Sequence, residues 1–297
     1  MDPASVTVII QEPEFRLLTT LRYVQFNHVN VVESLPLIQE WKRAELDLLS
    51  LSRHRLHAAA QACFGPQSEV SKKFKADGAE LALRDAIDET TAARHPEPAK
   101  GFFRDLRVRV LVGSGGQVGV ECVPMGPEKP LTVLENDTFH HVPRATWFFA
   151  NSDSEDYPFA KVYIDSVPTS TSIFTRHKTT FRQPYDEARS RAGIVHTPPT
   201  DAEVLLFNSR DEITEASVST PYFFRRDGMG GYELVTPSLQ SGGMIGVTQS
   251  KALREGFCTM DVVTLDGLQL RHGDVIWLSN AVRGFFRGRI HMQKEDP

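Results

Sequence analysis

The segment KVYIDSVPTSTSIFTRHKTTFRQPYDEARSRAG, residues 161–193, decides the fold of this chain, and the other segments are interpreted around it. It opens with residues 162–164, a β-branched and aromatic run that predicts a strand. A stretch rich in Pro, Ser and Thr follows, and a helical pattern then covers residues 184–191 and ends at Gly193. Lys178 therefore lies at a joint between a strand and a helix, where folds often carry functional side chains. Taken alone, a lysine in such a place is more often a solvated surface residue or a helix cap, so the rest of the chain has to decide its role.

The composition limits the class of protein. The chain has 297 residues, of which 40% are apolar and 24% charged, and this is ordinary for a globular protein with room for two domains. Its formal net charge of −5 argues against a nucleic-acid-binding protein, which normally has a basic surface. No apolar run approaches the roughly 18 residues that a membrane span needs, and residues 1–10 lack the basic start and the apolar core of a secretory signal.

Cysteine and histidine usage points to a reducing compartment and to no metal. Cys63, Cys122 and Cys258 are odd in number and far apart in the sequence, which fits reduced thiols in a cytoplasmic protein. The ten histidines lack Cys or carboxylate partners at ligand spacing, so we expect no metal site.

The first half of the chain predicts a small domain of strands and helices. Apolar and polar residues alternate in residues 15–23, 106–112 and 118–122, and this period of two is typical of strands. Apolar residues recur at spacings of three and four in residues 35–62 and 79–91, which predicts two helices.

The second half predicts a larger domain that is rich in sheet. Residues 124–156 are rich in Pro, Asn, Asp and Ser without a sustained period, so we expect the connection there and domains at residues 1–150 and 151–297. The elements expected after Gly193 are strands at residues 203–207, 212–218 and 274–278, a hairpin at residues 223–236, a helix at residues 249–254 and a closing strand to residue 290. Together the two halves predict an α+β protein.

Four further features could carry chemistry together with Lys178, and each has an ordinary alternative. Glu215 shares a strand face with Ile213 and Ser217 and could point inward, although it could equally be a solvated acid at a sheet edge. Residues 246–248 (Gly-Val-Thr) directly precede a helix, where free N–H groups, the helix dipole and a hydroxyl can bind phosphate, and where a plain helix cap is also common. The loop Ser279-Asn280-Ala281 could add N–H donors to the same anion. Arg55 lies on the apolar face of the first helix, where an arginine often only extends its head group to solvent.

In this order along the chain, these features resemble the class IV aminotransferase family of pyridoxal-phosphate enzymes, also called fold type IV. The resemblance is strongest to the aminodeoxychorismate-lyase-like members with HKTT around the lysine, and it covers most of the chain. It rests on the segments FRLLTTLRY, SRHRLHAAAQACFG, LRVRV, FTRHKTTFRQPYDEAR, EVLLFNSRDEITEAS, GMIGVTQ and VIWLSNAVRG.

The resemblance implies roles for the residues that match the family's motifs. Lys178 would form the Schiff base with the cofactor, pyridoxal 5′-phosphate, and Glu215 would pair with the pyridine nitrogen so that the ring stores electrons. Arg55 would bind the phosphate through two parallel hydrogen bonds. The further donors to the phosphate would be Val247, Thr248, Asn280 and Ala281.

The resemblance also implies a fold and an activity. The fold would be that of D-amino-acid aminotransferase, with a small N-terminal α/β domain and a larger C-terminal domain, and the enzyme would be a homodimer. The activity would be that of a 4-amino-4-deoxychorismate lyase, which releases pyruvate and forms 4-aminobenzoate for folate synthesis. Lys178 or Thr20 would return the proton, and the candidates for binding an anionic amine substrate are Arg22, Tyr23 and Arg107.

Departures from the family's pattern leave two alternatives open. The histidine that the family places three residues before the phosphate arginine is Ser52, the arginine after G-V-T is Gln249, and the S-R-G signature of bacterial lyases is replaced by residues 113–115. A class IV transaminase acting on a branched-chain amino acid, a D-amino acid or an amine would share every cofactor contact. A non-catalytic relative that acts as a binding protein would not need Lys178, Glu215 and Arg55 together.

Overall fold

The computed structural model describes the chain except for residues 1, 28–35, 132, 134–158, 227–230 and 293–297. Contacts between Cα atoms divide the chain into two compact units. The N-terminal unit holds the described residues of Thr7–His141 together with His177–Thr180. The C-terminal unit holds those of Met1–Val6, Val142–Arg176 and Phe181–Pro297.

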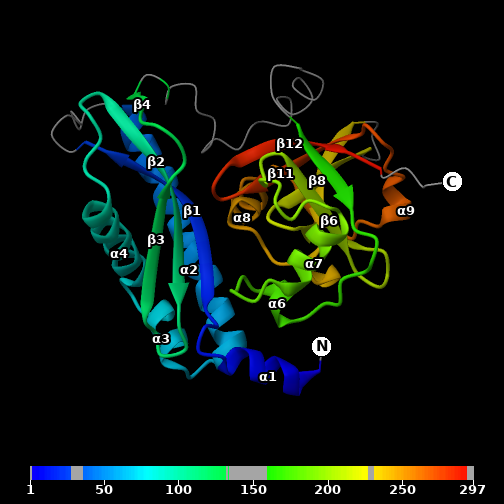
Figure 1. Ribbon diagram of the computed structural model, residues 1–297, viewed down its shortest axis with the longest axis horizontal. Helices are drawn as coiled ribbons and strands as arrows, with labels where there is room; N and C mark the ends of the chain where they lie inside the picture. The colour runs from blue at the N-terminus through cyan, green and yellow to red at the C-terminus, as the bar shows by residue number, and fades with distance from the viewer. Residues whose placement is uncertain (1, 28–35, 132, 134–158, 227–230, 293–297) are drawn as a thin grey trace. The chain divides into compact units, whose positions relative to one another are not determined.

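A small antiparallel sheet forms the frame of the N-terminal unit (Figure 1). Its strands run in the order β1-β2-β3, and the short β4 pairs with β2. The strands are β1 (Leu17–Phe26), β2 (Phe102–Val112), β3 (Val118–Pro124) and β4 (Lys129–Pro130), and the helices are α2 (Pro36–Phe64), α3 (Glu69–Lys75) and α4 (Ala79–Arg94), with α1 (Pro3–Gln11) before β1.

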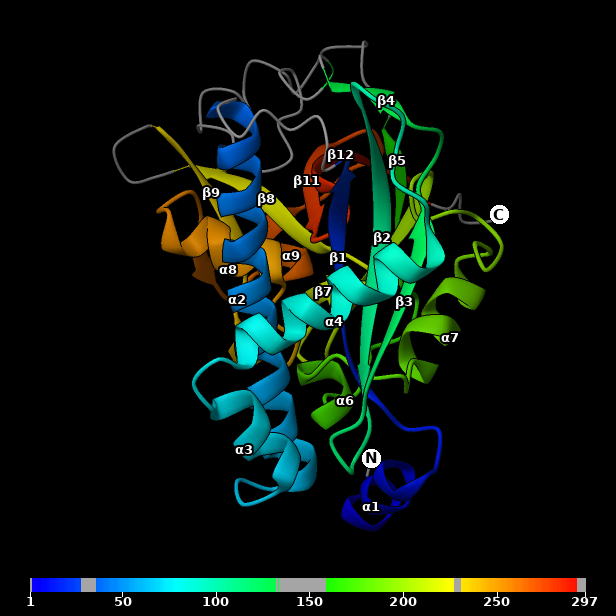
Figure 2. The same cartoon turned by 90° about the vertical axis from the view of Figure 1, so that its left-hand side faces the viewer.

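Side-chain alternation decides which face of this sheet is covered. The β2 side chains of Leu106, Val108 and Val110 are fully buried, whereas Arg107 between them is exposed. Figure 2 shows α2 and α4 together on one face of the sheet. Leu21, which pairs with Val108, lines a pocket with residues of both helices, so this is the face of the apolar residues. Burying a Leu or Val side chain contributes about 1.5–3 kcal/mol, so the period of two read from the sequence fixes how the helices pack.

The C-terminal unit contains a mixed sheet of eight strands in the order β10-β9-β8-β11-β12-β5-β6-β7. Buried apolar residues from β5, β6, β7, β8, β9, β11 and β12 form one cluster, which the curled sheet encloses (Figure 1). The strands are β5 (Ala160–Ile164), β6 (Ala202–Phe207), β7 (Ile213–Ala216), β8 (Thr220–Arg226), β9 (Tyr232–Pro237), β10 (Thr259–Asp261), β11 (Val275–Asn280) and β12 (Gly284–Ile290).

Helices cover the outside of this sheet. The helices of the unit are α6 (Ile173–Arg176), α7 (Gln183–Arg191), α8 (Val247–Arg254) and α9 (Leu265–Leu268), with a 3-10 turn at Leu239–Ser241. Tyr185 and Ala188 of α7 pack with Val204 and Leu206 of β6. On another part of the sheet, α8 contributes Ala252 to a second apolar cluster that includes residues of β8, β9 and β11.

The α+β class expected from the sequence is confirmed, and the helices expected at residues 35–62, 79–91, 184–191 and 249–254 are α2, α4, α7 and α8. Gly193 ends the α7 region with a φ of 69°, a conformation that suits glycine. The short elements α1, α3, α6, α9 and β10 were not expected. The expected domain boundary at residues 150/151 and most of the expected connection lie outside the described residues.

Candidate active site

Lys178 is attached to the first residues of β1. Its carbonyl oxygen accepts a hydrogen bond from the Leu18 N–H at 3.0 Å, and the Thr180 N–H donates to the Arg16 carbonyl at 2.9 Å. Thr179 forms an antiparallel bridge with Leu17, so residues 178–180 extend the free edge of β1. This pairing explains why the lysine segment groups with the N-terminal unit although it lies far from β1 in the sequence.

The bridge also determines the direction of the lysine. Thr179 and Leu17 are both buried on the face that the helices cover. Because side chains alternate along a strand, Lys178 points to the opposite face, which it shares with Thr20. Both of these side chains are half-buried, so the lysine is withdrawn from water only in part.

Arg55 of α2 contacts Thr19, the residue after Leu18 in β1. Its Nη2 donates to Thr19 Oγ1 at 2.5 Å, whereas its Nε is buried and has no hydrogen-bond partner among the described residues. Loss of solvent around the guanidinium lowers the pKa of Arg55 to about 10, so it remains a cation at neutral pH. A half-buried cation with an unused, buried donor is suited to an anion that accepts several hydrogen bonds.

Ser52 lies one turn before Arg55, at the place where the family pattern has a histidine. Its side chain is fully buried, and its Oγ has no hydrogen-bond partner within the described part of the chain. The small hydroxyl therefore leaves a second unused polar atom on the same face of α2 as Arg55.

The three candidates for substrate binding differ in their surroundings. Arg22 donates from Nε to Asp105 at 2.7 Å, and both side chains are buried. Lys129 donates to the other oxygen of Asp105 at 2.9 Å. Arg107, which lies opposite Arg22 in the β1–β2 register, is exposed and forms no ion pair or hydrogen bond with its side chain among the described residues. Of the two arginines, Arg107 has the charge that is available to a ligand.

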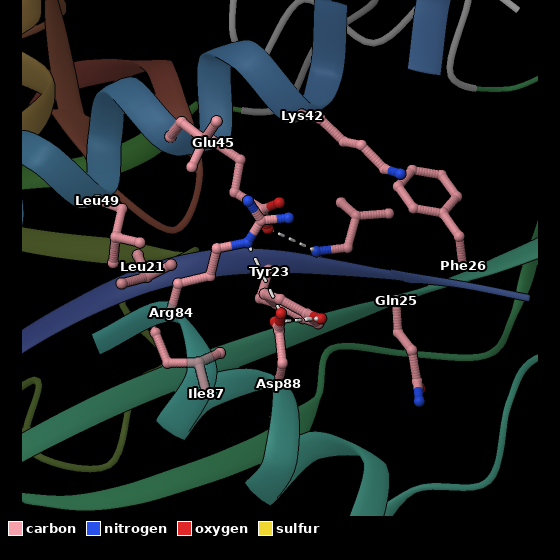
Figure 3. A pocket seen from close by; sticks show the side chains of 12 residues that line it. Leu21, Tyr23, Gln25, Phe26, Lys42, Glu45, Leu49, Arg84, Ile87 and Asp88 are labelled. Carbon is pink, nitrogen blue, oxygen red and sulfur yellow. Dashed lines mark hydrogen bonds and ion pairs between the residues drawn. The ribbon is translucent and has the colours of Figure 1, made fainter. Parts of the chain in front are cut away.

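Tyr23 lies on the face of β1 opposite to Arg22, in a pocket between β1, α2 and α4 (Figure 3). Its hydroxyl donates to Asp88 at 2.9 Å. The pocket has a volume of about 140 Å³ and also contains Glu45, which accepts a long hydrogen bond of 3.4 Å from the Val24 N–H. Burial raises the pKa of Glu45 to about 8. The strand therefore does not bring Arg22 and Tyr23 together, as a joint contact with one substrate would require.

The C-terminal unit positions Glu215 on β7. The carboxylate is buried, and Glu215 Oε1 accepts a hydrogen bond from the Tyr185 hydroxyl of α7 at 2.8 Å. Glu215 lies opposite Leu206 in the β6–β7 register, on the side where Leu206 packs with Tyr185. The sequence left open whether Glu215 is a solvated edge residue, and its burial excludes that alternative.

The loop before α8 runs directly against β7. A Cβ atom on Gly243 would lie 2.4 Å from the Thr214 carbonyl oxygen, so only glycine permits this approach. The helix then begins at Val247, and the Oγ1 of Thr248 is buried without a hydrogen-bond partner among the described residues. The two first residues of α8 thus lie close to the strand that carries Glu215.

Gln249 explains one departure from the family's pattern. It is buried, and its Oε1 accepts from the Gly246 N–H at 2.9 Å while its Nε2 donates to Thr236 Oγ1 at 3.1 Å. The side chain that replaces the family's arginine therefore fastens the start of α8 to β9.

The turn between β11 and β12 lies near the connection between β7 and β8. Asn280 Oδ1 accepts from the N–H groups of Val282 and Arg283, both at 3.0 Å, and Nδ2 donates to the Val218 carbonyl at 3.4 Å. The side chain of Asn280 is therefore committed to the protein, and Ala281 beside it is buried. Glu215, the start of α8 and this turn surround the connection between β7 and β8.

In the N-terminal unit, the carbonyl of Lys178 and the guanidinium of Arg55 are hydrogen-bonded to consecutive residues of β1, although the Lys178 side chain points to the face opposite Thr19. In the C-terminal unit, the expected residues lie about residues 218–220; they are Glu215, Val247, Thr248, Asn280 and Ala281. Two of the residues expected to hold a phosphate, Arg55 and Thr248, each have a buried polar atom without a partner among the described residues. This donor set fits pyridoxal phosphate.

Two residues that contact this site, Thr19 and Tyr185, were not predicted from the sequence. Thr19 follows Leu18 on a strand that was expected, but its bond to Arg55 depends on how α2 packs. Tyr185 lies in the expected helix after the lysine, three residues after Arg182 and four before Arg189, and this spacing on one helix face was the available signal.

None of the helices in the described part of the chain has the length and apolar character that a membrane span needs. In the same part of the chain, no three or more His, Cys, Asp or Glu residues are arranged to hold a metal ion.

The curled eight-stranded sheet, the lysine next to α7 and the buried acid on β7 define a protein of fold type IV. The sequence model of the amino-transferase class IV family matches residues 48–289, and the chain belongs to this family of enzymes. Enzymes of the family generally depend on pyridoxal phosphate. The matched region includes Arg55, Lys178, Glu215 and both loops of the C-terminal site.

Individual relatives agree with this assignment. An aminodeoxychorismate lyase of Saccharomyces cerevisiae is 27% identical over 198 residues, which cover 62% of this chain and 51% of the yeast protein. The chain thus spans about half the length of that relative.

Two solved structures have the same fold. One is a Mesorhizobium loti protein provisionally named an amino-acid aminotransferase, with a TM-score of 0.54, 21% identity and coverage of 93% of this chain and all 100% of that one. The other is a branched-chain aminotransferase of Thermoproteus uzoniensis, with a TM-score of 0.55, 15% identity and coverage of 96% and 82%.

Proposed function

We propose that the protein is a pyridoxal-phosphate-dependent lyase that releases pyruvate from 4-amino-4-deoxychorismate and forms 4-aminobenzoate, a precursor of folate. The observation that carries this proposal is the sequence similarity to the yeast aminodeoxychorismate lyase. The two groups of site residues support it, because both are those that this chemistry needs.

Each residue that is expected to bind the cofactor has a defined task. Arg55 would bind its phosphate through the guanidinium, and Val247 and Thr248 would bind it through an N–H group and the free hydroxyl. Asn280 and Ala281 would border the phosphate, and Glu215 would pair with the ring nitrogen. When bound, the cofactor supplies an electron sink for the bond-breaking step.

The protein's own residues would move the protons. Lys178 would hold the cofactor, and its Nζ would take the proton from the amine-bearing carbon of the substrate. Lys178 Nζ or Thr20 Oγ1 then returns a proton to the departing three-carbon unit, and the alternation along β1 that directs both side chains to one face supports this pair. Proton transfer by a positioned side chain typically contributes ~10²–10⁴-fold to the rate.

A substrate with two carboxylates needs cations that are not already neutralised. Arg107 meets this requirement better than Arg22, because Arg22 is paired with Asp105. We therefore assign a substrate carboxylate to Arg107 and retain Arg22 and Tyr23 only as weaker candidates.

We also infer that the enzyme is a homodimer. Val123 of β3 and Met125 just after this strand leave apolar side chains exposed. Neighbouring exposed apolar residues are typical of a surface that a partner covers. Light scattering at working concentration tests this, and a monomer would contradict it.

One assay separates the candidate activities. The purified protein is loaded with pyridoxal phosphate and incubated with aminodeoxychorismate, and pyruvate and 4-aminobenzoate are measured in parallel. Release of both products at equal rates supports the lyase. Conversion of the cofactor to its amine form by alanine, glutamate or another amino donor, without pyruvate release from aminodeoxychorismate, would instead identify a transaminase. Protein that stays colourless with the cofactor would indicate a non-catalytic binding protein.

A further inference from the structure

One face of α7 carries three side chains that contact Glu215 or Ser217. Arg182 at the start of the helix, Tyr185 and Arg189 are spaced three and four residues apart, so they lie on one helix face. Glu215 and Ser217 are two residues apart on and just after β7, so they lie on one strand face. The side chains of this helix face contact Glu215 and Ser217 on the strand face.

Two arginines fasten α7 to this strand on either side of Tyr185. Arg182 Nη2 donates to the Ser217 carbonyl at 3.0 Å, and Arg189 Nη1 donates to Ser217 Oγ at 3.0 Å. Arg189 also contacts Glu203 of β6 at 3.3 Å, and both of these side chains are buried. The helix therefore has little freedom to move relative to Glu215.

Tyr185 lies between these anchors and contacts the acid directly. Its ring is buried, the guanidinium carbon of Arg182 lies 5.0 Å from the ring centre, and its hydroxyl donates to Glu215 Oε1 at 2.8 Å. Burial and the neighbouring Glu215 raise the pKa of Tyr185 well above its ordinary value, so the phenol keeps its proton and remains a donor. A hydrogen bond to an ionised acceptor favours the charged form of that acceptor.

We propose that Tyr185 is a positioning residue that orients the Glu215 carboxylate and keeps it ionised for the ring nitrogen of the cofactor. This inference rests on the proposed function, because it assigns Tyr185 a task only if Glu215 contacts the cofactor. Tyr185 itself moves no proton and acts through Glu215.

Removal of the Tyr185 hydroxyl should change the pKa of Glu215 in one direction. In Tyr185→Phe, Glu215 loses a donor that stabilises its charge, so its pKa rises and it becomes protonated at higher pH. The energy of a hydrogen bond to a charged group shifts the pKa of that group by about one to two pH units. Arg182 and Arg189 of α7 and Glu203 of β6, which contact Tyr185 or Ser217, stay in place in this variant.

The test compares Tyr185→Phe with Tyr163→Phe. Tyr163 belongs to the same apolar cluster, is half-buried, and makes no hydrogen bond through its hydroxyl among the described residues, so it controls for the loss of one oxygen atom. The holoenzymes are titrated with acid while the visible absorbance of the cofactor is recorded, and kcat and KM are measured across the same pH range. For Tyr185→Phe we expect the acid limb of both profiles to move up by about one to two pH units, with kcat lowered about tenfold at neutral pH and KM changed less than threefold.

A second measurement needs no cofactor. Unfolding of the cofactor-free protein is followed for the wild type, Tyr185→Phe, Glu215→Gln and the double variant, and the four values form a thermodynamic cycle. Non-additive effects of the two substitutions support a direct interaction, whereas strictly additive effects overturn the proposal.

The outcomes also separate this inference from the proposed function. If wild-type protein takes up no pyridoxal phosphate, the proposed function fails and this inference fails with it. If the wild type takes up the cofactor but the profiles of Tyr185→Phe coincide with those of Tyr163→Phe, only the role of Tyr185 is overturned.

Discussion

Replacing Arg55 by methionine should stabilise the cofactor-free protein and weaken its binding of pyridoxal phosphate. Loss of solvent lowers the pKa of Arg55 from the ordinary value of an arginine to about 10. At about 1.36 kcal/mol per pH unit this is a cost of roughly 3 kcal/mol to the folded protein, present at all pH values below about 10. Water reaches part of the side chain, which reduces this cost, and loss of the bond to Thr19 removes about 1 kcal/mol of stability. We therefore expect Arg55→Met to be more stable by about 1–2 kcal/mol.

The effect on the cofactor has the opposite sign. Arg55 would make two charge-assisted hydrogen bonds to the phosphate, each worth about 1.5–3 kcal/mol. Since every 1.4 kcal/mol corresponds to a factor of about ten, the Kd for pyridoxal phosphate should rise about 10²-fold or more. A change that stabilises the protein while it weakens binding would identify Arg55 as a residue kept for its ligand.

The assay is thermal unfolding of the cofactor-free protein, followed by equilibrium titration with pyridoxal phosphate. Arg53→Ala is the matched control, because Arg53 is a neighbouring arginine of α2 that donates to the Phe74 carbonyl at 2.8 Å. Its loss should weaken the attachment of α3 and leave the cofactor Kd unchanged. A lower melting temperature for Arg55→Met, or cofactor binding equal to that of the wild type, would refute the reasoning.

Three further predictions concern other residues. Lys178→Ala should abolish turnover and the visible absorbance of bound cofactor while circular dichroism stays unchanged, and retained turnover would rule out its role. Arg107→Ala should raise KM about tenfold with little change in kcat. Arg109 is paired with Glu121 at 2.9 Å, so the control Arg109→Ala should change neither KM nor kcat. Equal effects of the two substitutions would contradict the assignment of Arg107 to a substrate carboxylate. Because burial raises the pKa of Glu45 to about 8, the unfolded state binds fewer protons than the folded state between pH about 4.5 and 8, so wild-type stability should fall across this window. Glu45→Gln should remove that fall in pH-dependent unfolding, and parallel curves for the two proteins would show that Glu45 is not buried in this way.

Periodic segments were predicted well, because their signals are local. The spacing of three and four in α2 and the period of two in β2 depend only on which side of each element is buried. The four-residue helices α6 and α9 are too short to show a period, so no pattern in the sequence could predict them. The short β10 depends on a parallel pairing with β9 that is likewise not visible in its own residues.

The candidate site was likewise predicted only where its signals are local. Lys178, Glu215 and Arg55 were identified from motifs, because a strand end, a small hydroxylic strand and an apolar helix face are properties of neighbouring residues. The pairing of Arg22 with Asp105 joins residues far apart in the chain, so the neutralisation of Arg22 and the availability of Arg107 could not be read from either segment.

The sequence by itself determined the elements, their buried faces and the residue types that this chemistry requires. Only the tertiary structure decided that residues 178–180 join the edge of β1, that Tyr185 donates to Glu215, and that Arg55 and Thr248 keep buried polar atoms without partners among the described residues. The physical reason is that a hydrogen bond between distant segments depends on how helices and sheets pack, and packing is a property of the whole chain.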